Sequence, residues 1–80
     1  MKLDDIHEND VVALLVDRPN EGLRRGDIGT VVHVFSATTK HPGGFVVEFI
    51  EESGATQALA DIVDPSHIVK LRFRPVRVAA

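Results

Sequence analysis

The chain contains no cysteine, no tryptophan and no tyrosine among its 80 residues. Without cysteine it has neither a disulfide nor a thiolate metal site, so its stability has to come from an aliphatic core and backbone hydrogen bonds. No apolar run approaches the roughly 18 residues of a membrane span, and the acidic N-terminal segment lacks the apolar centre of a signal peptide. We therefore expect a cytoplasmic protein that makes no contact with a membrane.

Positive charge is also scarce, because the chain has nine Lys and Arg but twelve Asp and Glu, which gives a net charge of −3. Nucleic-acid binders gain most of their affinity from clustered cations, and those that hold single strands stack bases on aromatic side chains. Nucleic acid is therefore an unfavourable partner. The charges are uneven, and we expect the acidic start and the basic end of the chain to attract each other. These charged residues are Asp4, Asp5, Glu8 and Asp10 at the start, and Lys70, Arg72, Arg74 and Arg77 at the end.

Five short runs rich in β-branched and aromatic residues, spaced about ten residues apart, predict five strands. They lie at 11–16, 28–35, 45–50, 56–62 and 68–73, and a Pro-containing segment at 64–67 predicts a short 3-10 turn before the last strand. This layout predicts an all-β fold, a five-stranded SH3-like barrel. The alternative is an OB barrel, but the connection at 51–55 is too short for the helix that fold places after its third strand. We expect a single domain with its core at 10–74, an irregular N-terminal arm at 1–9 and a C-terminal tail at 75–80.

Alternation of apolar and polar residues indicates which side of each strand faces the core. In the third strand Glu48 marks the outer face, so Phe45, Val47 and Phe49 should face inward. In the first loop Leu23 is the only apolar residue and should fill the space beneath it, whereas Phe35 is the one phenylalanine expected outside. The predicted core consists mainly of Val12, Leu14, Ile28, Val32, Val34, Val47, Phe49, Leu59, Ile68 and Leu71.

The sequence resembles a small uncharacterised bacterial family of stand-alone barrels that is known only as a domain of unknown function. The resemblance rests on DVVAL at 10–14, GLRRGDIGTVV at 22–32, VEFI at 47–50 and AL at 58–59, and it covers about residues 11–71. The stretch at 22–32 is also loosely similar to KOW-motif barrels and to the barrel of the nitrile hydratase β subunit. The family resemblance implies a barrel fold and brings no catalytic residue, cofactor or ligand.

Side chains that could perform chemistry are dispersed along the chain. Histidines 7, 33, 41 and 67 lack the close spacing of metal ligands, so we expect no metal and no cofactor. A general acid–base pair needs a cleft, which a small filled barrel hardly provides, so we do not expect an enzyme. Asp27 and Asp64 precede or follow turn residues and should accept hydrogen bonds from backbone N–H groups.

The basic residues form the one candidate binding surface. Lys70, Arg72 and Arg74 should project from the last strand, with Arg24 and Arg25 in the first loop. The simpler interpretation is an edge strand protected from aggregation by its charges; the functional one is a surface for a protein partner. We hypothesise a non-catalytic protein–protein interaction or accessory module, including an immunity-like partner of a neighbouring gene product. The alternative is a KOW-type nucleic-acid barrel. If the basic surface binds nothing, the connection at 36–44 is the next candidate.

Overall fold

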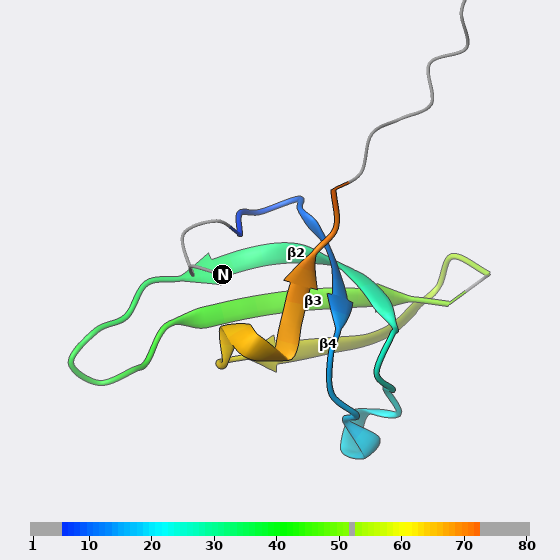
Figure 1. Cartoon of the computed structure of the whole chain (residues 1–80), viewed down its shortest axis with the longest axis horizontal. Coiled ribbons are helices and arrows are strands. Elements are labelled where there is room, and N and C mark those ends of the chain that lie inside the picture. The colour runs from blue at the N-terminus through cyan, green and yellow to red at the C-terminus, as the bar shows by residue number, and fades with distance from the viewer. Residues whose placement is uncertain (1–5, 52, 73–80) are drawn as a thin grey trace, which may run out of the picture.

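A computed structural model describes residues 6–51 and 53–72 of the chain. Five antiparallel strands form one sheet in the order β4-β3-β2-β1-β5. In Figure 1 the short strands β1 and β5 run across the long strands β2, β3 and β4. The strands are β1 (Val11–Leu14), β2 (Ile28–Phe35), β3 (Gly44–Ile50), β4 (Thr56–Ile62) and β5 (Ile68–Lys70), and the 3-10 turns are η2 (Pro19–Glu21) and η3 (Pro65–His67).

The predicted all-β fold, with a 3-10 turn before the last strand, is confirmed. Asp64 begins η3 as expected, because its Oδ1 accepts hydrogen bonds from the backbone N–H of Ser66 at 2.9 Å and from the Ser66 hydroxyl at 2.7 Å. β1 is shorter than predicted and ends at Leu14, although Leu14 still donates to the Asp27 carbonyl at 2.8 Å and Leu15 to the His67 carbonyl at 2.7 Å. The turn η2 lies in the first loop and was not predicted.

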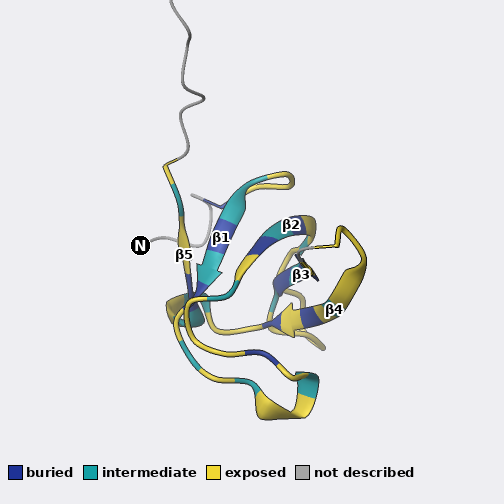
Figure 2. Cartoon of the chain, turned by 90° about the vertical axis from the view of Figure 1, so that its right-hand side faces the viewer, coloured by how far each residue is buried: buried dark blue, intermediate teal, exposed yellow. Residues whose placement is uncertain are grey.

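The core lies inside the curl of the sheet (Figure 2). Of the predicted core residues, Val12, Leu14, Val47, Phe49 and Ile68 are fully buried, and Val34 packs against them. The third strand has the predicted faces, with Phe45 also buried. The other buried hydrophobic side chains of the described residues are Ile6, Leu23, Val31, Ala60 and Ile62.

The prediction of the inward face of β2 was wrong. Ile28 is 57% exposed and Val32 42%, while Gly29 and Val31 face the core. Val31 pairs with Val47, but the next pair is His33 with Val46, so Val32 is the extra residue of a β-bulge. The bulge shifts the alternation by one residue, which returns Val34 to the core side.

The predicted core positions in the last two strands also need correction. Leu59 is 60% exposed, because it pairs with the outward Glu48, and its neighbours Ala60 and Ile62 are buried instead. The small side chain of Ala60 lies opposite Val47, where a larger residue would collide with the filled interior. Leu71 follows the end of β5 and is only half-buried.

The β1–β2 loop closes over one side of the sheet. Leu23 is fully buried beneath it, as predicted. Arg18 fixes this loop to β4: its Nη1 donates to the Asp61 carbonyl at 2.9 Å, while Nε and Nη2 donate to the Glu21 carboxylate at 2.6 and 2.8 Å. No helix in the described part of the chain is long and apolar enough to cross a membrane.

Candidate functional site

The structure places the loop arginines in a tight turn between β1 and β2. The backbone N–H of Arg24 donates to Asp27 Oδ2 at 2.9 Å, which confirms the predicted turn role of that aspartate. The backbone N–H of Arg25 donates to Asp17 Oδ1 at 2.9 Å. The chain is therefore held by acids on both sides of the turn, while both arginine residues are exposed.

The basic residues of the last strand have different surroundings. Lys70 Nζ lies 3.2 Å from Asp10 Oδ2, an ion pair between the acidic start and the basic end of the chain of the kind expected from the sequence. Arg72 is exposed beyond the end of β5. Arg74 lies outside the described residues.

The two basic groups occupy opposite ends of the β1–β5 ladder. The turn at 24–27 bonds to Leu14, which pairs with Ile68 at the start of β5. Arg72 is four residues further along, roughly 13 Å at the rise of an extended chain. In Figure 1 the β1–β2 loop lies at the bottom of the molecule, and the orange strand β5 runs upward, away from it. The loop arginines thus lie at one end of this ladder and Arg72 at the other.

Three histidines each lie beside a single carboxylate. His7 Nδ1 is 3.8 Å from Asp10, and His67 Nε2 is 3.5 Å from Asp64. His33 Nδ1 is 3.6 Å from the Glu8 carboxylate, an interaction that links β2 to the N-terminal arm. Within 6–51 and 53–72, no three His, Asp or Glu side chains gather where they could hold a metal ion.

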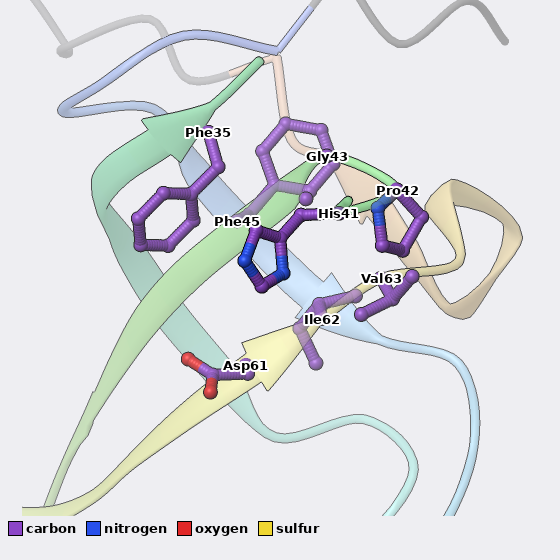
Figure 3. A pocket seen from close by; sticks show the side chains of 9 residues that line it. Phe35, His41, Pro42, Gly43, Phe45, Asp61, Ile62 and Val63 are labelled. Atoms are coloured by element: carbon purple, nitrogen blue, oxygen red, sulfur yellow. The ribbon is translucent and has the colours of Figure 1, made fainter. Parts of the chain in front are cut away.

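A pocket of about 350 Å³ lies between the β2–β3 loop (residues 36–43) and the end of β4 (Figure 3). Phe45 and Ile62 lie behind it; they pair with each other in the β3–β4 ladder and are almost completely buried in the core, so the other lining residues supply its exposed surface. Its rim carries two large exposed side chains, Phe35 at 48% and Val63 at 54%. The other lining residues are His41, Pro42, Gly43, Gly44 and Asp61.

Two glycines let the β2–β3 loop fold back closely enough to form the pocket wall. A Cβ at Gly44 would lie 2.6 Å from the carbonyl oxygen of Ile62, and a Cβ at Gly43 would lie 2.8 Å from that of Phe35. Thr38 holds the tip of the loop, because its Oγ1 accepts from the backbone N–H of His41 at 3.0 Å and its own N–H donates to the His41 carbonyl at 2.7 Å. The pocket wall is therefore fixed by backbone contacts.

Asp61 supplies the negative charge of the pocket. Its carbonyl accepts from Arg18, but no side chain in the described residues donates a hydrogen bond to its carboxylate. The charge of Arg18 is engaged by Glu21, whose hydrogen bonds raise the pKa of Arg18, with a smaller contribution from Asp61. The same contact lowers the pKa of Glu21. Asp61 is thus left as an exposed carboxyl group at the β4 side of the pocket.

Phe35 lies outside the core, as predicted, whereas His41 was considered as a metal ligand and Pro42 was given no binding role of its own. Neither the pocket nor the role of Asp61 was foreseen, because they depend on how closely the loop approaches β4. The signal available was the pair Gly43-Gly44 directly before a strand, which indicates a close backbone approach.

A comparison with protein families matches residues 8–68 to a family described as "Domain of unknown function (DUF4926)". The match covers most of the chain and bears out the resemblance seen in the sequence. No curated protein and no solved structure was found to match the chain.

Proposed function

The chain belongs to the DUF4926 family of domains of unknown function, and from this premise we propose that it is a non-catalytic module that binds a protein partner through its pocket. The pocket carries the proposal: apolar side chains line a preformed hollow, and two of them, Phe35 and Val63, are exposed at its rim. At about 350 Å³ it lies at the lower end of the range for ligand pockets, about 300–1,000 Å³. That volume suits one or two side chains of a partner.

The polar groups of the pocket support binding over catalysis. Its two titratable residues, His41 and Asp61, are joined to each other by no hydrogen bond or ion pair, although both are in the described part of the chain. A catalytic pair needs an acid or base oriented by a second group. An exposed histidine and an exposed aspartate without such a contact instead provide polar rim contacts.

The distribution of charge supports a protein partner over nucleic acid. The described arginines and lysines are dispersed, with Arg18 held by Glu21 and Lys70 close to Asp10. The pocket itself carries a carboxylate, which repels phosphate. Counterion release, the main source of nucleic-acid affinity, therefore has few clustered cations to act on.

Affinity capture with matched variants tests the proposal. Phe35→Ser and Val63→Ser alter the pocket rim, and Leu59→Ser is the control, because Leu59 is an equally exposed apolar residue of β4 outside the pocket. We expect a stoichiometric, nuclease-resistant protein partner to be recovered by the wild type and by Leu59→Ser, and to be reduced at least about tenfold by either pocket variant.

Two results would contradict the proposal. Recovery that disappears on nuclease treatment would indicate nucleic acid. Recovery that survives both pocket variants but is lost in the Arg24→Glu/Arg72→Glu double variant would place binding on the basic residues. Melting temperatures of all variants should stay near that of the wild type, because the altered side chains are exposed.

A further inference from the structure

We infer that the pocket takes an aliphatic or aromatic side chain from a peptide segment in which the adjacent residue is Lys or Arg, and that the Asp61 carboxylate pairs with this cation. The inference rests on the proposed function and names the chemistry of the partner. It combines two features of the pocket, its apolar lining and the exposed Asp61 carboxyl group at its edge.

The apolar interior fits a side chain because its shape exists before binding. Phe45 and Ile62 are immobilised in the core, and the opposite wall is fixed by the close approach of Gly43 to the Phe35 carbonyl and of Gly44 to the Ile62 carbonyl. A preformed hollow costs little ordering entropy on binding. Pro42 and the ring of His41 complete the wall, as Figure 3 shows.

The position of Asp61 selects the residue next to the inserted side chain. Asp61 pairs with Val46 on the outer face of the sheet, while the following residue, Ile62, points into the core. Its carboxylate therefore lies at the edge of the pocket rather than on its floor, as in Figure 3. A cation of the partner can reach it from solvent while an apolar neighbour fills the hollow.

The charges around Asp61 leave that carboxylate available. Arg18 is the nearest cation in the described residues that acts on it, but its guanidinium already donates two hydrogen bonds to Glu21 and one to the Asp61 carbonyl. An anionic or neutral segment would gain nothing from Asp61. A basic residue gains an ion pair whose strength is that of an exposed contact, roughly two- to fivefold in affinity.

Three blocked dipeptides serve as probes: N-acetyl-Leu-Arg-amide, N-acetyl-Leu-Gln-amide and N-acetyl-Gly-Arg-amide. Each is titrated into the ¹⁵N-labelled full chain while the amide signals are followed. We expect Leu-Arg to shift the signals of residues 35, 41, 43–45 and 61–63 saturably, and to bind about two to five times more tightly than Leu-Gln. Gly-Arg, which lacks the apolar side chain, should cause no saturable shift there.

Two charge variants isolate the contribution of Asp61. Asp61→Asn should reduce Leu-Arg binding to the level of Leu-Gln and leave Leu-Gln unchanged. Glu51→Gln removes an equal charge in the β3–β4 turn, outside the pocket, and should change neither. The spectrum of each variant without probe shows whether it is folded.

The inference is overturned if Leu-Arg and Leu-Gln bind equally, if Asp61→Asn has no effect, or if no probe binds saturably. These failures are separate from failure of the proposed function. Partner recovery that is lost in Val63→Ser but unchanged in Asp61→Asn would keep the interaction module and reject the cation.

Discussion

At the scale of single residues, Gly29 is the clearest example of a residue that the packing of the core requires. It lies on the inward side of β2 opposite Phe49, and a Cβ there would lie 2.6 Å from Val47 Cγ1 and 2.8 Å from the Glu48 carbonyl oxygen. Real Cβ atoms do not approach other atoms so closely, so the strand can approach β3 at this point only without a side chain. The glycine is required for packing rather than for a turn.

We predict that Gly29→Ala lowers the free energy of unfolding by about 1–3 kcal/mol, the usual cost of overpacking. Chemical denaturation of the purified chain measures it. Val32→Ala, on the same strand but exposed, is the control and should cost less than about 1 kcal/mol. An alanine at 29 as stable as glycine would show that β2 and β3 separate freely here.

A second residue, Asp10, makes stability depend on pH. The backbone N–H of His7 donates to its Oδ2 at 2.7 Å, and Lys70 Nζ lies 3.2 Å away. The hydrogen bond first, and then the lysine, hold the pKa of Asp10 below its usual value. A carboxylate whose pKa is lower in the folded than in the unfolded state stabilises the fold above about pH 4, and this contribution is lost as the pH falls through the folded pKa.

We therefore predict that the contribution of Asp10 to the melting temperature is constant from pH 5 to 7 and is lost in acid below about pH 4. Asp10→Asn should cost about 1 kcal/mol or less at pH 7 and should make the acid decline shallower. Glu51→Gln, an equal loss of charge in an exposed turn, should leave the slope unchanged. Thermal melts between pH 2 and 7 measure both; identical slopes for wild type and Asp10→Asn would exclude the contribution.

At the scale of elements, the bulge in β2 decides which side chains form the core. Val31 is fully buried opposite Val47, whereas Val32 is 42% exposed and has no partner in β3. We predict that Val31→Ala costs about 2 kcal/mol, by loss of buried methyl groups and the cavity they leave. Val32→Ala should cost less than about 1 kcal/mol. The difference in denaturation midpoints checks this, and equal costs would mean that the strand is regular.

The elements also show where the sequence is sufficient and where it is not. The strands at 28–35 and 56–62 and the turn after Asp64 follow from β-propensity and turn chemistry, which act locally. The inward face of β2 does not follow from the sequence, because an alternating pattern cannot account for the extra residue that a bulge inserts. Leu59 was expected in the core, but its pairing with the outward Glu48 places it outside.

At the scale of the whole molecule, the site depends on contacts that the sequence does not specify. The pocket needs the β2–β3 loop to fold back onto the end of β4, a contact between residues about twenty positions apart. The predicted basic residues are likewise placed by a long-range contact, because the β1–β5 register sets the distance between the turn at 24–27 and Arg72. The spacing of the β-rich runs predicts the fold class from the sequence. The position of the pocket is known only from the three-dimensional structure.

Hydrogen–deuterium exchange of the chain, alone and bound to the partner recovered by affinity capture, tests the binding face most directly. The account predicts that the partner slows exchange at residues 35–45 and 61–63, around the pocket, and leaves the turn at 24–27 and residues 70–72 unchanged. Protection confined to 24–27 and 70–72, with the pocket segments exchanging as in the free chain, would contradict it.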